Sequence, residues 1–182
     1  VARPCRRTSY SAIFLRCVAG TKTVTAALAP PDPNQLLAQL CAQLRPVITA
    51  ETALVGIYTG GVWLASRLRS ELGIDTPVGT LDVTFYRDDF GRIGLHPNAK
   101  RSDIPFDAEA RHIILVDDVR YTGRTIRAAM NELFDYGRPA RIQLAVLIDR
   151  DERELPIAAD FVGAKLSLPR DQILVLEQGT NA

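Results

Sequence analysis

Four consecutive aliphatic residues, Ile113 to Val116, run directly into a pair of carboxylates, and this run constrains the fold more than any other stretch of the chain. An unbroken aliphatic run of this length is typical of a strand buried on both faces, as in a parallel sheet. A turn follows at residues 121–125, and a helical pattern begins after it. The stretch therefore predicts a strand, a loop and a helix, with the loop at the carboxyl end of the strand, where open α/β sheets place their ligands.

The helix after the turn is predicted from the spacing of its apolar residues. They recur on one face of a helix, at Ile126, Ala129, Met130, Leu133 and Phe134. Gly137 is expected to end the helix in the left-handed conformation, and Pro139 lies just beyond it.

The residues of the turn indicate a ligand that carries a phosphate. Four residues stand at the expected helix start: Thr122, Gly123, Arg124 and Thr125. Unpaired backbone N–H groups and the helix dipole favour an anion there, the glycine lets the backbone approach it closely, and the hydroxyls add donors. Asp117 and Asp118 would repel a phosphate, but they suit vicinal hydroxyls or a magnesium ion that they help to hold. A ligand with a phosphate at one end and a diol in the middle is a ribose 5-phosphate.

Two other interpretations of this stretch stay open. It is compatible with a buried strand and an N-capped helix whose acids have no chemical role. Paired acids at a strand end also occur in receiver domains, although those domains lack the T-G-x-T turn. The sugar-phosphate interpretation is favoured because the acids, the turn and the helix agree.

A second strand–loop–helix unit stands earlier in the chain. Residues 53–58 read as a short buried strand, Thr59, Gly60 and Gly61 form a turn, and residues 62–72 read as a helix that Gly73 ends. The small residues let backbone amides approach an anion, although T-G-G alone is more often just a turn. Two such units predict an α/β fold.

Other segments extend this pattern. Asp32 is expected to cap a helix with Pro33 at its first position. That helix has one apolar face, made by Leu36, Leu37, Leu40, Leu44 and Val47. Three further strands are expected, at residues 81–85, 141–149 and 173–176.

Residues 113–125 resemble the phosphoribosyl-pyrophosphate motif of type I phosphoribosyltransferases. Their continuation, at Arg138-Pro139 and residues 144–156, resembles the PyrR family, whose members are pyrimidine operon regulators and uracil phosphoribosyltransferases. The similarity covers about residues 54–163. It implies the type I phosphoribosyltransferase fold, an α/β fold with a central, mainly parallel sheet flanked by helices, a flexible lid loop and a small hood.

The resemblance also implies where phosphoribosyl pyrophosphate (PRPP) binds. The residues at the matching positions are Thr59, Gly60, Asp117, Asp118, Tyr121, Thr122, Gly123, Arg124 and Thr125. The two acids are expected to act in catalysis and to hold Mg²⁺, largely through substrate and water. The family often has arginine where Gly60 stands, so one cationic contact to the pyrophosphate is missing here.

Two charged loops complete the expected site. The family's Y-R-D-D is present at residues 86–89, in a long stretch without regular structure, and it implies a lid in which Arg87 contacts pyrophosphate. A solvated polar loop is the alternative for this stretch. Asp149 and Arg150 begin the segment that the resemblance places in the base-reading hood, where backbone groups do most of the recognition.

The expected reaction forms UMP and pyrophosphate from uracil and PRPP. No Cys–His or Ser–His pair suggests a covalent intermediate, and no base that removes the uracil proton is identifiable. Two rival functions are a phosphoribosyltransferase for another base, such as hypoxanthine or orotate, and a non-catalytic RNA binder that senses nucleotides. Self-association is expected from the resemblance.

RNA binding is only weakly supported. RNA-binding relatives carry basic residues on the first helix and after R-E-L-P. Here the first helix has Arg45 as its only charge, Ala158 stands where those relatives have arginine, and Lys165 is displaced by one position. A basic surface, which RNA requires, is therefore not evident.

The composition fits one domain. The 182 residues are 47% apolar, with a net charge of +1 that predicts no overall attraction to nucleic acid or membrane. Residues 1–31 are expected to be a disordered extension or a misassigned start, with a signal peptide as the alternative, and residues 32–182 to form the single domain. Three cysteines without metal-ligand spacing favour the cytoplasm, and no run is long enough for a membrane span.

Overall fold

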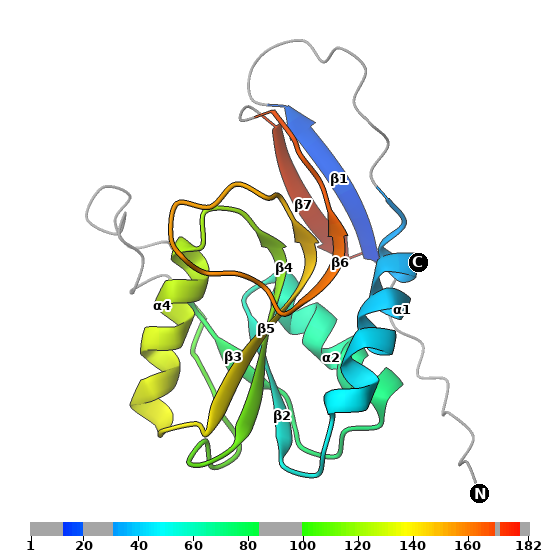
Figure 1. Ribbon diagram of the computed structural model, residues 1–182. Coiled ribbons are helices and arrows are strands. Elements are labelled where there is room, and N and C mark those ends of the chain that lie inside the picture. Colours follow the sequence, from blue (N-terminus) through cyan, green and yellow to red (C-terminus); the bar gives the residue numbers. More distant parts are fainter. Residues whose placement is uncertain (1–12, 20–30, 84–99, 170–171, 179–182) are drawn as a thin grey trace, which may run out of the picture.

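A five-stranded parallel sheet forms the centre of the protein. The structure is a computed structural model that describes residues 13–19, 31–83, 100–169 and 172–178 (Figure 1). The strands lie in the order β3-β2-β4-β5-β6, and every neighbouring pair is parallel. Their bounds are β2 Thr52–Ile57, β3 Gly79–Leu81, β4 His112–Arg120, β5 Arg141–Asp149 and β6 Phe161–Lys165. The expected α/β architecture is confirmed.

Helices cover both faces of this sheet. On one face lie α1 (Pro33–Leu44) and α2 (Gly60–Leu72), and on the other lies α4 (Arg124–Leu133) (Figure 1). Because successive side chains of a strand point to opposite faces, Leu54 packs with the α1 and α2 side chains while Val55 packs with those of α4. The sheet is thus buried on both sides, which explains its aliphatic strands.

The start of α1 agrees with the prediction. Oδ1 of Asp32 accepts the N–H of Asn34 at 2.9 Å, and Pro33 is the first helical residue. The predicted leucine face is buried, and a short 3-10 helix, η1 (Arg45–Val47), follows.

The end of α4 differs from the prediction. The α-helix stops at Leu133, and a 3-10 turn, η3 (Phe134–Tyr136), leads to Gly137, whose φ of 143° is positive but outside the left-handed helical region. A 3-10 turn has three residues per turn, so side chains after Leu133 leave the apolar stripe. Phe134, expected on the buried face, is therefore 52% exposed.

Two strand boundaries also differ. Strand β4 continues to Arg120, so the two acids lie inside the strand rather than after it. Strand β3 ends at Leu81, ahead of most of the alternation expected over residues 81–85, where residues 84 and 85 lie outside the described part.

A small antiparallel sheet stands beyond the main one, and we refer to it as the hood. It consists of β1 (Ile13–Ala19) and β7 (Gln172–Gln178), with Leu15 opposite Leu176 (Figure 1). Strand β1 lies within residues 1–31, the stretch expected to be a disordered extension or a misassigned start. The signal was hidden because β1 is almost entirely apolar and shows no alternation. None of the helices in the described ranges is long and apolar enough to cross a membrane.

Leu15→Ala should lower the free energy of unfolding by about 2 kcal/mol, near the low end for a buried leucine. Leu15 is 7% exposed and packs in the same cluster as Leu174 and Leu176. Arg16→Ala is the matched control, because its side chain is exposed and its ion pair with Glu177 lies on the surface. Urea unfolding of both variants checks this, and equal midpoints would contradict a packed β1.

Candidate active site

The two acids lie side by side near the carboxyl end of β4. Asp117 is 6% exposed and Asp118 is half-buried. The N–H of Asp118 donates to Oδ1 of Asp117 at 3.0 Å, and the N–H of Val119 donates to Oδ1 of Asp118 at 3.0 Å. These backbone bonds hold each carboxylate by one oxygen.

Both carboxyl groups have perturbed pKa values. Burial, followed by the charge of Asp118, raises the pKa of Asp117 well above 3.8. Burial also raises the pKa of Asp118. The pair therefore holds more negative charge than its surroundings balance, and hydroxyl donors or a cation would relieve it.

The turn after β2 lies directly against this pair. Thr59 is exposed and precedes α2, which begins at Gly60. A Cβ added at Gly60 would lie 2.4 Å from Oδ2 of Asp118, so any other residue here would require the Asp118 side chain to shift. The two strand–loop–helix units thus meet at one edge of the sheet, because parallel strands have their carboxyl ends on the same side.

The expected phosphate cradle begins α4. Gly123 precedes the helix with a φ of 92°, a conformation that favours glycine, and the N–H of Arg124 donates to Oγ1 of Thr122 at 3.3 Å. Thr125 is half-buried in the first turn. The four predicted residues therefore stand where unpaired N–H groups of a helix start can receive an anion.

A crossing segment, residues 150–160, runs over this cradle. The N–H groups of Glu154 and Leu155 both donate to the carbonyl of Thr122, at 3.1 and 3.2 Å. Nε of Arg124 donates to the Glu154 carboxylate at 2.9 Å, so this exposed guanidinium is turned toward the segment. A cavity of about 220 Å³ lies between loop and segment, lined by Tyr121, Thr122, Glu152, Arg153 and Glu154.

The side chains of Asp149 and Arg150, predicted in the hood, have structural partners. Asp149 forms a buried ion pair with Arg120, which stands opposite it on β4. Arg150 lies 4.1 Å from the Tyr121 ring centroid, and its NH groups donate to the carbonyls of Leu168, Pro169 and Gln172. Arg150 thereby connects Tyr121 with the segment that leads into β7 and with β7 itself.

Sequence reasoning missed the role of Arg120. The sequence does offer a signal for it, because the two expected strands end near residues of opposite charge, Arg120 and Asp149. Arg87, the predicted lid contact, lies outside the described residues, so its role stays a prediction.

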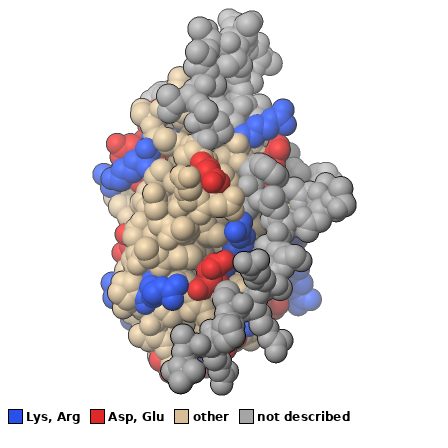
Figure 2. All heavy atoms as spheres, turned by 90° about the vertical axis from the view of Figure 1, so that its right-hand side faces the viewer, with Lys and Arg blue, Asp and Glu red and all other residues tan. Residues whose placement is uncertain are grey.

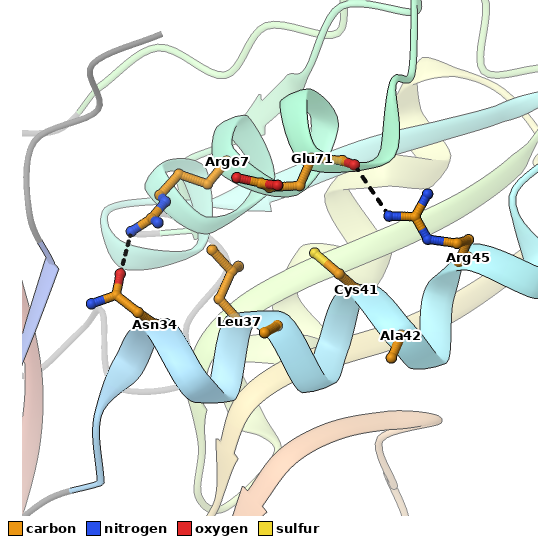
Figure 3. A pocket seen from close by; sticks show the side chains of 8 residues that line it. Asn34, Leu37, Cys41, Ala42, Arg45, Arg67 and Glu71 are labelled. Carbon is orange, nitrogen blue, oxygen red and sulfur yellow. Dashed lines mark hydrogen bonds between the residues drawn. The ribbon is translucent and has the colours of Figure 1, made fainter. Parts of the chain in front are cut away.

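A larger cavity lies away from the strand ends, between α1 and α2. It measures about 370 Å³, and Cys41, Arg45, Arg67 and Glu71 are among the residues that line it (Figure 3). Burial and the charge of Glu71 raise the pKa of the Cys41 thiol. A thiol in this state is a poor nucleophile, so the candidate active site is the one at the strand ends.

Comparison with known proteins defines the class. Residues 33–174 match the family model of the phosphoribosyl transferase domain. A hypoxanthine-guanine phosphoribosyltransferase of Bacillus anthracis has the same fold, with a TM-score of 0.60 and 17% identity over 82% of this chain and 86% of that one. A purine phosphoribosyltransferase of Pyrococcus horikoshii gives a TM-score of 0.55 and 22% identity, over 74% and 82% of the two chains. The protein is a phosphoribosyltransferase.

Curated relatives define the branch. The bifunctional protein PyrR of Pseudomonas entomophila is 54% identical over 142 residues, which cover 76% of this chain and 83% of the relative. That of Pseudomonas aeruginosa is 53% identical over 147 residues, covering 78% and 86%. The chain belongs to the PyrR family of phosphoribosyltransferases, and the resemblance seen in the sequence is confirmed.

Proposed function

We propose that this protein transfers the phosphoribosyl group of PRPP to uracil, forming UMP and pyrophosphate. The observation that carries the proposal is the meeting of three parts at one sheet edge: the acid pair, the glycine turn against Asp118 and the cradle at the start of α4. These parts match a diol, a pyrophosphate and a 5′-phosphate respectively. Membership of the PyrR family supports uracil as the base.

The reaction needs little nucleophilic help from the chain. Its transition state is expected to be cationic at the sugar carbon and anionic at the departing pyrophosphate, so fixed donors near the pyrophosphate lower the barrier. In this proposal the backbone of Thr59 and Gly60 meets the pyrophosphate, and the cradle from Thr122 to Thr125 holds the 5′-phosphate. Asp117 and Asp118 accept hydrogen bonds from the ribose hydroxyls and fix the sugar. The crossing segment and Tyr121 limit water at the base side.

The donor set of the acid pair suits magnesium. The described residues contain no group of three or more His, Cys, Asp or Glu side chains that could hold a metal ion, so these residues alone do not form a closed cage. Burial raises the pKa values of both carboxyl groups, so a cation beside them would stabilise their ionised forms. Such a cation would take its other ligands from substrate and water. When bound, Mg²⁺ would neutralise charge on the departing pyrophosphate. Asp117 and Asp118 are the residues that would hold it.

The pH dependence of activity follows from the same two pKa values. Both carboxyls are raised above 3.8, and both must be ionised to accept from hydroxyls or to hold a cation. As the pH falls, activity should therefore be lost at pH values above the usual aspartate range, while the protein is still folded. A profile of kcat/KM against pH, with circular dichroism at each pH, checks this. A loss that coincides with unfolding would contradict it.

A substrate panel tests the base. Uracil, hypoxanthine, guanine and orotate are each offered with PRPP and Mg²⁺, and nucleotide formation is followed by chromatography. The proposal expects UMP to be the main product. Faster turnover of a purine or of orotate would show that the protein acts on one of the rival bases. The proposed PRPP site would not be affected by that result.

A regulatory function through RNA is the second candidate, because the curated relatives are named as bifunctional. The first helix does not favour it. Its exposed positions carry no charged side chain, and Figure 2, which views the side where α1 lies, shows scattered charges of both signs rather than a continuous basic surface. RNA affinity that falls steeply as salt rises would support regulation. Affinity equal to that for an unrelated RNA would count against it.

Self-association and a cytoplasmic location remain part of the proposal. Self-association is supported by family membership alone. The free, buried Cys41 is compatible with a reducing compartment. Light scattering at several protein concentrations measures the subunit number.

A further inference from the structure

Among the described residues already discussed, none supplies a cation for the pyrophosphate, and Arg87, the predicted lid contact, lies outside the described part of the chain. PRPP carries three phosphate groups and would lie beside two carboxylates, so positive charge is needed near the pyrophosphate. Arg120 pairs with Asp149, Arg124 with Glu154, and Arg150 with hood carbonyls. Position 60, where the family often has arginine, is a glycine and supplies no charge.

Lys100 lies beside the turn that would receive the pyrophosphate. Its Nζ is 4.5 Å from the ring centroid of Tyr58, the residue directly before Thr59 and Gly60. The side chain is exposed, and a cation–π contact uses the charge of the ammonium without occupying its three N–H donors. Those donors therefore remain available to an anion that arrives at the turn.

Hydrogen bonds hold the backbone around Lys100 against β3 and the residue that follows it. Its N–H donates to Oδ2 of Asp82, and the N–H of Asp82 donates to Oγ of Ser102 at 2.7 Å. Thr80 and Asp103 exchange two backbone hydrogen bonds of 2.7 and 2.8 Å. Tyr58 is held as well, since its N–H donates to the carbonyl of Leu81 at 2.9 Å. The backbone of both residues is thus held at β2 and β3, which limits the ordering cost on binding to that of the Lys100 side chain.

We propose that Lys100 binds the pyrophosphate of PRPP and supplies the positive charge that is absent at Gly60. Its side chain, whose ammonium lies 4.5 Å from the Tyr58 ring centroid, brings a positive charge next to the turn while position 60 remains a glycine. This inference rests on the proposed function. It assigns to Lys100 a contact with the leaving group, so its loss should weaken binding of pyrophosphate but not binding of a ligand that lacks it.

The test compares two ligands and three variants by titration calorimetry. The ligands are magnesium pyrophosphate and ribose 5-phosphate, and the variants are Lys100→Met, Lys100→Arg and the matched control Arg101→Met. Arg101 is the exposed neighbour in the chain, so the control removes an equal charge one residue away. Lys100→Met should raise the Kd for pyrophosphate about 10- to 100-fold, the range for a charged hydrogen bond, and leave that for ribose 5-phosphate unchanged. Lys100→Arg should keep most of the affinity.

Several results would overturn the inference. Wild-type affinity for pyrophosphate in Lys100→Met would do so, as would an equal loss in Arg101→Met or an equal loss for ribose 5-phosphate. The wild type could bind PRPP and make UMP, and Lys100→Met could behave identically. This result would rule out the role of Lys100 and leave the proposed function in place. A folded wild type that binds neither pyrophosphate nor PRPP removes the proposed function together with it.

Discussion

Asp117→Asn is expected to lower kcat/KM by about 10²- to 10³-fold, the usual effect of removing one fixed electrostatic contact in an active site, and at the same time to stabilise the fold. Burial and the neighbouring charge of Asp118 raise the pKa of Asp117. A carboxyl whose pKa is higher in the folded than in the unfolded state contributes stability at low pH, and that contribution is lost as the pH rises through the folded-state value. At neutral pH the ionised Asp117 is therefore a cost to the fold.

Asparagine removes that cost and keeps the geometry. Its side-chain oxygen can still accept the N–H of Asp118, the 3.0 Å bond that now ends on Oδ1 of Asp117. We expect the free energy of unfolding to rise by about 1 kcal/mol at pH 7, within the range for optimised sites. Urea unfolding and UMP formation measure the two effects. Asp75→Asn, at an exposed position far from the strand ends in sequence, should change neither. A less stable variant that keeps most of its turnover would contradict both arguments.

Asp149→Ala is expected to destabilise the protein by about 3–5 kcal/mol, because it leaves the buried Arg120 charge without its partner. Arg120 is 2% exposed and Asp149 is 5% exposed, and each ends a central strand of the parallel sheet. The same carboxylate also accepts the N–H of Asp151 at 2.8 Å, so the turn into the crossing segment loses a contact as well.

Glu154→Ala is the matched control for this prediction. It breaks the exposed ion pair with Arg124, whose contribution should be about 0–1 kcal/mol. Urea unfolding of the two variants should therefore give clearly different midpoints. Equal midpoints would contradict the expectation that the buried Arg120–Asp149 pair contributes more to the free energy of unfolding than the exposed pair does.

The central unit of the fold could be predicted because its signals are local. The strand, the acids, the turn and the helix follow one another within residues 113–133, and each agrees with the next. The close approach of Gly60 to Asp118 could be expected in outline, because carboxyl ends of parallel strands share one edge. The structure adds the contact itself, because a Cβ at position 60 would meet the side chain of Asp118.

Other features depend on residues far apart in the chain. Strand β1 gains its partner from β7, more than 150 residues later, and no local pattern announces that pairing. The ion pair of Asp149 with Arg120 and the contacts of Arg150 with the hood carbonyls also join residues from different segments, so no local pattern predicts them. The end of α4 was misjudged because a 3-10 turn and an α-helix have nearly the same sequence signals.

The most direct test of the account is UMP formation from uracil, PRPP and Mg²⁺ by the wild type and by an Asp117→Asn/Asp118→Asn double variant. The account predicts UMP and pyrophosphate in equal amounts from the wild type, and almost complete loss of turnover in a folded double variant. Absence of UMP from well-folded wild type that still binds PRPP would contradict it. So would a double variant that turns over at the wild-type rate.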